Sequence, residues 1–121
     1  MSLFRIIFAS FEDSKEGDKR NIVSEAHLNS LINYELSRVE KNTKICHKNE
    51  GNVGLCVYEI LADVLLFHSA NDDIIPQWEF GNPYVSRVAS RVGSRAHAEL
   101  LLMVQLVLPG ANAFYYGDEL C

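Results

Sequence analysis

Residues 77–93 read QWEFGNPYVSRVASRVG, and they indicate the fold more clearly than any other stretch of the chain. A short apolar segment leads into the turn-prone pair Gly81-Asn82, and a helix-like pattern begins at about Ser86. We therefore expect a strand, a tight turn and a helix in succession. The turn has the form of one that delivers functional groups, yet it presents Pro83 and Tyr84. Neither side chain is an obvious acid, base or metal ligand near neutral pH.

The segments on either side alternate between strand-like and helix-like patterns. Apolar runs predict strands at 3–9, 31–36 and 113–116 in addition to 77–83, and helical spacing predicts helices at 21–32, 55–67 and 86–108. Gly93 should weaken or interrupt the last helix, and the polar residues 37–54 should form a loop. This order implies parallel strands joined by right-handed crossovers. We expect one α/β unit over residues 1–121, with no helix left to cover the edge of its last strand.

Composition excludes several classes of function. The 121 residues are 48% hydrophobic and 22% charged, which is typical of a globular protein. A net charge of -5 argues against nucleic acid as a partner. The longest apolar run, at 100–108, is interrupted by Gln105 and is well short of the roughly 20 residues that span a bilayer. We expect no membrane span in this chain.

The three cysteines do not define a metal or redox site. Cys46, Cys56 and Cys121 leave at least one thiol unpaired in any intrachain scheme. Such an odd set is more often reduced, and a Cys46–Cys56 bridge that closes a small loop is the less favoured alternative. A zinc set of Cys46, His47, Cys56 and His68 can be written, but its spacing matches no usual structural zinc pattern. We therefore expect neither metal nor cofactor.

Charged residues near the C-terminus can be interpreted as structural or as functional. Arg87, Arg91 and Arg95 lie four apart on the expected helix, and such a stripe is usually solvated or paired. Asp118 and Glu119 follow the last strand, where parallel α/β folds place catalytic carboxylates. Adjacent residues point in different directions, however, so capping or pairing with one of the arginines is an equal alternative.

Two motifs together resemble the last third of the catalytic barrel of glycoside hydrolase family 13, with the maltase and α-glucosidase branch most similar. That family has a G-N-H-D turn followed by an Arg after its seventh strand, and an L-P-G…Y-Y-G-[DE]-E run on its eighth. Here GNPYVSR (81–87) and LPGANAFYYGDEL (108–120) match in order and spacing, with Asn112 where the family usually has Pro. The positions carried over as framework of the former site are Gly81, Asn82, Arg87, Tyr115, Tyr116, Gly117, Asp118 and Glu119.

The resemblance implies that the chain is a fragment, the C-terminal half of a barrel. Residues 3–10 are similar to the fifth strand and 31–36 to the sixth, so the expected fold is a partial (β/α)8 TIM barrel with strands five to eight and their helices. A complete barrel takes about 250 residues. The strand that carries the family's nucleophilic Asp therefore falls outside this sequence.

The same alignment leaves no catalytic position intact. The family's acid/base Glu corresponds to Ser10, whose hydroxyl cannot transfer that proton near neutral pH; Glu12 would serve only if the register shifted. The His-Asp pair that holds the sugar corresponds to Pro83 and Tyr84. A retaining glycosidase needs two carboxyl groups flanking the scissile bond. The alignment predicts that the chain is not an enzyme.

A framework kept without its reactive groups is similar to the heavy-chain subunits of heteromeric amino-acid transporters. These carry an amylase-like ectodomain on the extracellular side of the plasma membrane and escort a light chain. The resemblance implies protein contacts as the function, with a transporter light chain or a missing half-barrel as partner. The alternative is a fragment of an α-glucosidase acting in carbohydrate metabolism. Half a barrel also exposes strand edges, so we expect self-association.

Overall fold

The computed structural model describes residues 5–10, 16–39 and 52–120 and shows an α/β fold. Four strands form one sheet: β1 (Phe8–Ser10), β2 (Ser30–Asn33), β3 (Ile75–Glu79) and β4 (Ala111–Ala113). All three strand pairs are parallel, and the spatial order β1-β2-β3-β4 is the order in the sequence. A four-stranded parallel sheet of this kind is compatible with part of a barrel, and it confirms the predicted α/β class.

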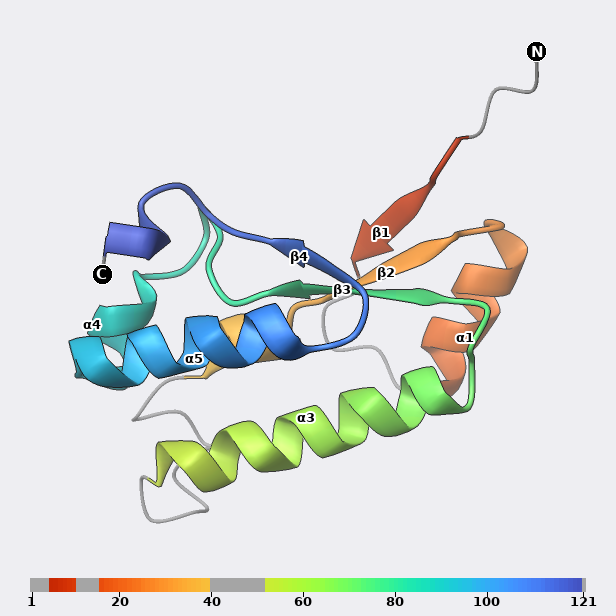
Figure 1. The fold of residues 1–121 in the computed structure, drawn as a ribbon. Coiled ribbons are helices and arrows are strands. Elements are labelled where there is room, and N and C mark those ends of the chain that lie inside the picture. The colour runs from red at the N-terminus through yellow and green to blue at the C-terminus, as the bar shows by residue number, and fades with distance from the viewer. Residues whose placement is uncertain (1–4, 11–15, 40–51, 121) are drawn as a thin grey trace.

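The helices connect successive strands. They are α1 (Glu16–Glu25), α3 (Val53–Ser69), α4 (Val88–Val92) and α5 (Arg95–Val107), with 3-10 turns η1 (Glu35–Arg38) and η2 (Asp118–Leu120) after β2 and β4. Figure 1 shows α3 and α5 on the same side of the sheet. No helix of the described residues covers the opposite face. Parallel sheets normally have both faces covered, whereas the part of the chain that the structure describes covers one.

Several predicted boundaries were wrong for identifiable reasons. The apolar residues assigned to one helix at 21–32 belong to two elements, α1 and β2, because His27 has a positive φ of 52° that ends the helical path. The strand expected at 31–36 is Ser30–Asn33, and η1 takes the residues after it. The strand expected at 113–116 is Ala111–Ala113, so Phe114, Tyr115 and Tyr116 lie beyond the ladder.

The other differences are smaller. β1 ends at Ser10, and its expected first residues fall partly outside the described range. β3 begins at Ile75 rather than Gln77, and α3 extends from Val53 because Asn52 caps it by accepting a hydrogen bond from Leu55 N at 3.0 Å. The predicted interruption at Gly93 is confirmed, since this residue has φ 66° and separates α4 from α5.

The main core lies between the sheet and its helices. Trp78 and Phe80 are fully buried and pack with Leu36 of η1, Val57 and Val64 of α3, and the α4–α5 residues Val88, Val92, Ala98 and Leu101. Trp78 Nε1 donates to the carbonyl of Pro109 at 2.7 Å, which satisfies the polar end of a buried indole. Gln105 Nε2 donates to the carbonyls of Trp78 and Ala113 at 3.2 and 2.9 Å, so α5 bonds both β3 and β4.

Arg91 was expected to lie on a solvated or paired helix surface with Arg87 and Arg95, but it points into the protein. Its side chain is buried and donates to carbonyls from three parts of the chain: Ser86 before α4 at 2.9 Å, Phe80 after β3, and Ser37 and Val39 around the end of η1. Arg95, by contrast, is exposed and pairs with Glu99 at 2.9 Å. A guanidinium has five donors in a rigid fork, which suits a contact with several carbonyls at once.

The structure tests the expectations about cysteines, membrane spans and metal sites for the residues that it describes. Cys56 is buried in α3 and is disulfide-bonded, so the expected reduced state was wrong for this thiol; Cys46, His47 and Cys121 lie outside the described residues. Among residues 5–10, 16–39 and 52–120, no helix is long and apolar enough to cross a bilayer. The same ranges contain no group of three or more His, Cys, Asp and Glu side chains that could hold a metal ion.

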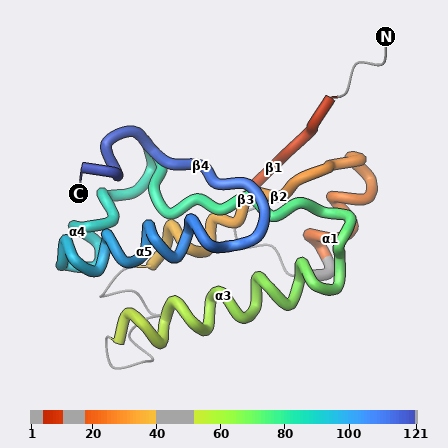
Figure 2. The backbone as a smooth tube through the Cα atoms, in the orientation of Figure 1, coloured from red at the N-terminus to blue at the C-terminus, as the bar shows by residue number. Residues whose placement is uncertain are grey.

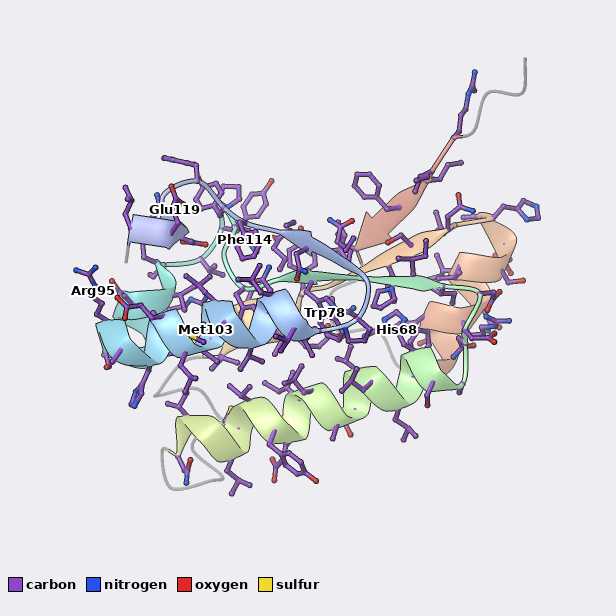
Figure 3. The ribbon with its side chains drawn as sticks, viewed as in Figure 1. His68, Trp78, Arg95, Met103, Phe114 and Glu119 are labelled. Carbon is purple, nitrogen blue, oxygen red and sulfur yellow. The ribbon has the colours of Figure 1, made fainter. Side chains whose placement is uncertain are left out.

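His68 occupies a buried polar contact rather than a metal site. Its Nδ1 lies 3.2 Å from the carbonyl of Ile74, and its Nε2 lies 3.1 Å from Asn33 Nδ2, which also donates to the carbonyl of Gln77. A carbonyl can only accept, so Nδ1 carries the proton and the neutral ring accepts at Nε2. His68, from the last turn of α3, and Trp78, from β3, are labelled in Figure 3.

The structure predicts a pH-dependent stability that originates at His68. Burial lowers the pKa of His68 below its ordinary value of 6.5, although the hydrogen bond to Ile74 and the charge of Glu35 oppose this and Lys19 adds to it. A lowered pKa means that the unfolded chain binds the proton more readily. The stabilisation is therefore present above about pH 6.5 and is lost as the pH falls below that value toward the folded-state pKa.

Urea unfolding of the wild type and of His68→Gln between pH 5 and pH 8 measures this contribution. The wild type should lose stability relative to the variant as the pH falls, and exposed His97→Gln should follow the wild-type curve. Parallel pH curves for the wild type and His68→Gln would show that the buried ring does not contribute.

Candidate functional site

The turns that follow β3 and β4 meet at the carboxyl-terminal edge of the sheet. After β3 the chain continues through Phe80 to Tyr84, and after β4 it continues to Gly117 and η2. The segment after β4 lies beside the segment after β3 in Figure 1. In parallel α/β sheets, ligand and catalytic groups come from such turns, which makes this edge the candidate site.

Asp118 is the buried charge of the site. Its side chain is only 3% exposed, and it packs directly on Gly81. A Cβ at Gly81 would lie 3.0 Å from Asp118 Cγ and would overlap Oδ2. Gly81 is not among the glycines with positive φ, so the position is small because of the carboxylate beside it and not because of its backbone conformation.

Arg87 supplies the positive charge that faces this carboxylate. Its Nη1 lies 3.2 Å from Asp118 Oδ1 and also donates to the carbonyl of Tyr116. The guanidinium carbon lies 4.9 Å from the ring centre of Tyr115 and 4.8 Å from that of Tyr116, within the range of cation–π attraction. Arg87, at the start of α4, therefore contacts three residues of the turn after β4: Tyr115, Tyr116 and Asp118.

Gly117 and Asn82 shape the two turns. Gly117 has φ 81°, a conformation that favours glycine, and a Cβ there would lie 3.5 Å from Arg87 Nη2. Asn82 is buried, and its Oδ1 accepts from the backbone N–H of Tyr84 at 2.9 Å, which closes the turn locally. The structure thus brings together seven of the eight framework positions. Glu119, the eighth, is exposed at the surface beside them.

The positions expected to have carried the chemistry are not part of this cluster. Pro83 is exposed, and the side chain of Tyr84 is 86% exposed, so neither lines an enclosed site. Ser10 ends β1, the strand at the opposite edge from β4. Three strand spacings of about 4.8 Å separate those strands by about 14 Å. Glu12 lies outside the described residues.

Glu79 is a carboxyl group that the sequence did not single out. It is the last residue of β3 and is half-buried. Burial raises the pKa of Glu79 above its ordinary value of 4.5, while a hydrogen bond with Asn82 acts in the opposite direction. A carboxyl with a raised pKa at a strand end is a group that could donate a proton. Its position between Trp78 and the Gly81-Asn82 turn was the only available signal, because burial is not visible in sequence.

Comparisons with known proteins give one local similarity. A 45-residue segment is 42% identical to the amino acid transporter heavy chain SLC3A1 of Rattus norvegicus; the match covers 37% of this chain and 6% of that protein. No family model matches the chain, and no solved structure matches it. The relationship to the transporter heavy chain is therefore a loose one that rests on a short segment.

The contact between Gly81 and Asp118 predicts a large effect from a small substitution. Gly81→Ala would force the Asp118 carboxylate away from Arg87 and should destabilise the fold by about 1–3 kcal/mol in urea unfolding. Gly54→Ala in α3 is the control: the new methyl would lie 3.3 Å from Asn52 Oδ1, a tight contact that a small shift of the Asn52 side chain relieves, and alanine favours a helix. It should change stability little.

A second substitution tests whether Gly81→Ala destabilises the fold by displacing the Asp118 carboxylate. If the methyl acts by displacing the carboxylate, adding Asp118→Ala to Gly81→Ala should cost less than the sum of the two single losses. Full additivity of the two losses would mean that Gly81 is required for another reason.

Proposed function

We propose that this chain is a non-catalytic, amylase-like scaffold of the transporter heavy-chain type, built as part of a barrel and acting through protein contacts. The observation that carries the proposal is the combination at the strand ends. The contacts that join the turns after β3 and β4 are present, whereas the positions aligned with reactive groups are Ser10, Pro83 and Tyr84. The local similarity to a transporter heavy chain supports the same assignment.

The carboxyl groups of the site do not form a glycosidase pair. A retaining mechanism needs two carboxyl groups about 5–5.5 Å apart that flank the scissile bond. Asp118 is buried, packed on Gly81 and paired with Arg87, so it is held in a structural contact. Glu119 is exposed at the surface, which leaves Glu79 as the half-buried carboxyl group of the described edge. One carboxyl with a raised pKa can donate a proton but cannot also serve as the nucleophile.

The proposed partner is the light chain of an amino-acid transporter on the extracellular side of the plasma membrane. Exposed Tyr84 and Tyr116 stand at the edge where the two turns meet, and tyrosine is enriched in the cores of protein interfaces. The disulfide at Cys56 also favours an oxidising compartment, where such bonds persist.

The alternative, an α-glucosidase fragment, is favoured by one observation, the raised pKa of Glu79. The non-catalytic character of the scaffold is tested by assaying the purified chain with maltose and 4-nitrophenyl α-glucoside from pH 4 to pH 7. We expect no hydrolysis above the buffer rate at any pH. Saturable hydrolysis that Glu79→Gln abolishes would overturn the scaffold proposal, and Glu99→Gln, on an exposed helix surface, is the matched control.

A further inference from the structure

We propose that two copies of this chain close an eight-stranded parallel barrel, with β4 of each copy paired to β1 of the other. The inference rests on the strand edges and on the uncovered face of the described sheet, and it shares with the proposed function the premise that this sheet is part of a barrel. It specifies the partner, the edges that meet and the direction of the strands.

The described residues at the two edges of the sheet carry few of the features that normally prevent pairing, although Pro109 precedes β4. Native proteins protect edge strands with charges, prolines or a covering element. Beside β1, the side chains of Ile6 and Phe8 are 69% and 56% exposed, and Arg5 is the one charged residue between positions 5 and 10. The segment 108–116, which contains β4, has no charged residue at all. Figure 2 shows β1 running out from the body of the molecule beside β2.

The uncovered face of the sheet has the character of a barrel interior. The strand registers place Phe8, Ser30 and Ile75 in one row, Ser10, Ile32, Gln77 and Ala111 in the next, and Glu79 and Ala113 in a third. Glu79 thus adds one half-buried carboxyl group to this face. Leu31 and Trp78, on the alternate positions, face the helices. Ile75 is 46% exposed on this face. A barrel interior is a packed layer of such side chains from successive strands, so closure would cover them.

The direction of the strands permits closure with two copies. All four strands run the same way, and a two-fold axis along the barrel keeps that direction in the second copy. The edge of β4 then meets the edge of β1 as a parallel pair, twice per dimer. A contact between two different surfaces usually leaves open ends, but here it closes after two copies because four and four strands make eight.

Two features oppose or compete with this assembly. The net charge of -5 repels a second copy, although the edge segments themselves are nearly uncharged. The helices also expose apolar side chains, with Leu66 of α3 65% exposed and Val107 of α5 81% exposed. Association through those helix surfaces is the competing arrangement, so the test must separate the strand edges from the helices.

The test is light scattering coupled to gel filtration on the full chain, over a hundredfold range of concentration. We expect a species with twice the mass of the 13.6 kDa chain. Ile6→Lys at the β1 edge and Ala111→Lys at the β4 edge should each raise the dissociation constant at least about tenfold. Leu66→Lys and Val107→Lys are the controls, equally exposed but on helices, and should leave the dimer intact. Circular dichroism checks that every variant is folded.

Mixing the two edge variants tests which edges meet. A dimer of one Ile6→Lys copy and one Ala111→Lys copy contains one interface with no substitution, so mixing should restore part of the dimer. A chain that stays monomeric throughout would overturn the proposal. So would an open series of larger species, dissociation by the helix variants alone, or a dimer that Ile6→Lys disrupts and Ala111→Lys does not, which would indicate pairing of β1 with β1.

Discussion

The ion pair between Arg87 and Asp118 is the contact on which the carboxyl-terminal edge of the fold depends. Asp118 is buried against Gly81, and a buried carboxylate is tolerated only with compensating charge and hydrogen bonds. Arg87 provides both, and the rings of Tyr115 and Tyr116 fix its guanidinium. Because Arg87 precedes α4 and Asp118 lies in η2, the pair joins the end of the β3 unit to the end of the chain.

At the carboxyl-terminal edge of the sheet, the polar side chains make structural contacts, and the exposed side chains of the turn after β3 carry no obvious reactive group. Arg87, Asp118 and Asn82 have polar groups that are engaged with each other or with the backbone of the two turns. The exposed residues Pro83 and Tyr84 offer no obvious acid or base near neutral pH. Under the scaffold proposal these contacts are kept without reactive groups, because the same contacts hold the two turns together. This is the physical basis of the scaffold proposal.

The sequence predicted the strand–helix alternation and the break at Gly93, since periodicity and glycine report local structure directly. It misplaced α1 and β2, because their apolar residues fall in one helix-like series and the positive φ of His27 cannot be read from sequence. It missed the raised pKa of Glu79 and the burial of Arg91, whose acceptors include carbonyls at Ser37 and Val39. Such properties depend on segments brought together by tertiary structure, which one sequence does not reveal.

A double-mutant cycle on Arg87→Ala and Asp118→Asn tests most directly whether this cluster is a structural link. Urea unfolding of the wild type, both single variants and the double variant, at one protein concentration, gives the coupling free energy. The account predicts that each single substitution destabilises the fold and that the coupling is about 1 kcal/mol or more. Single variants as stable as the wild type, with no coupling between them, would contradict it.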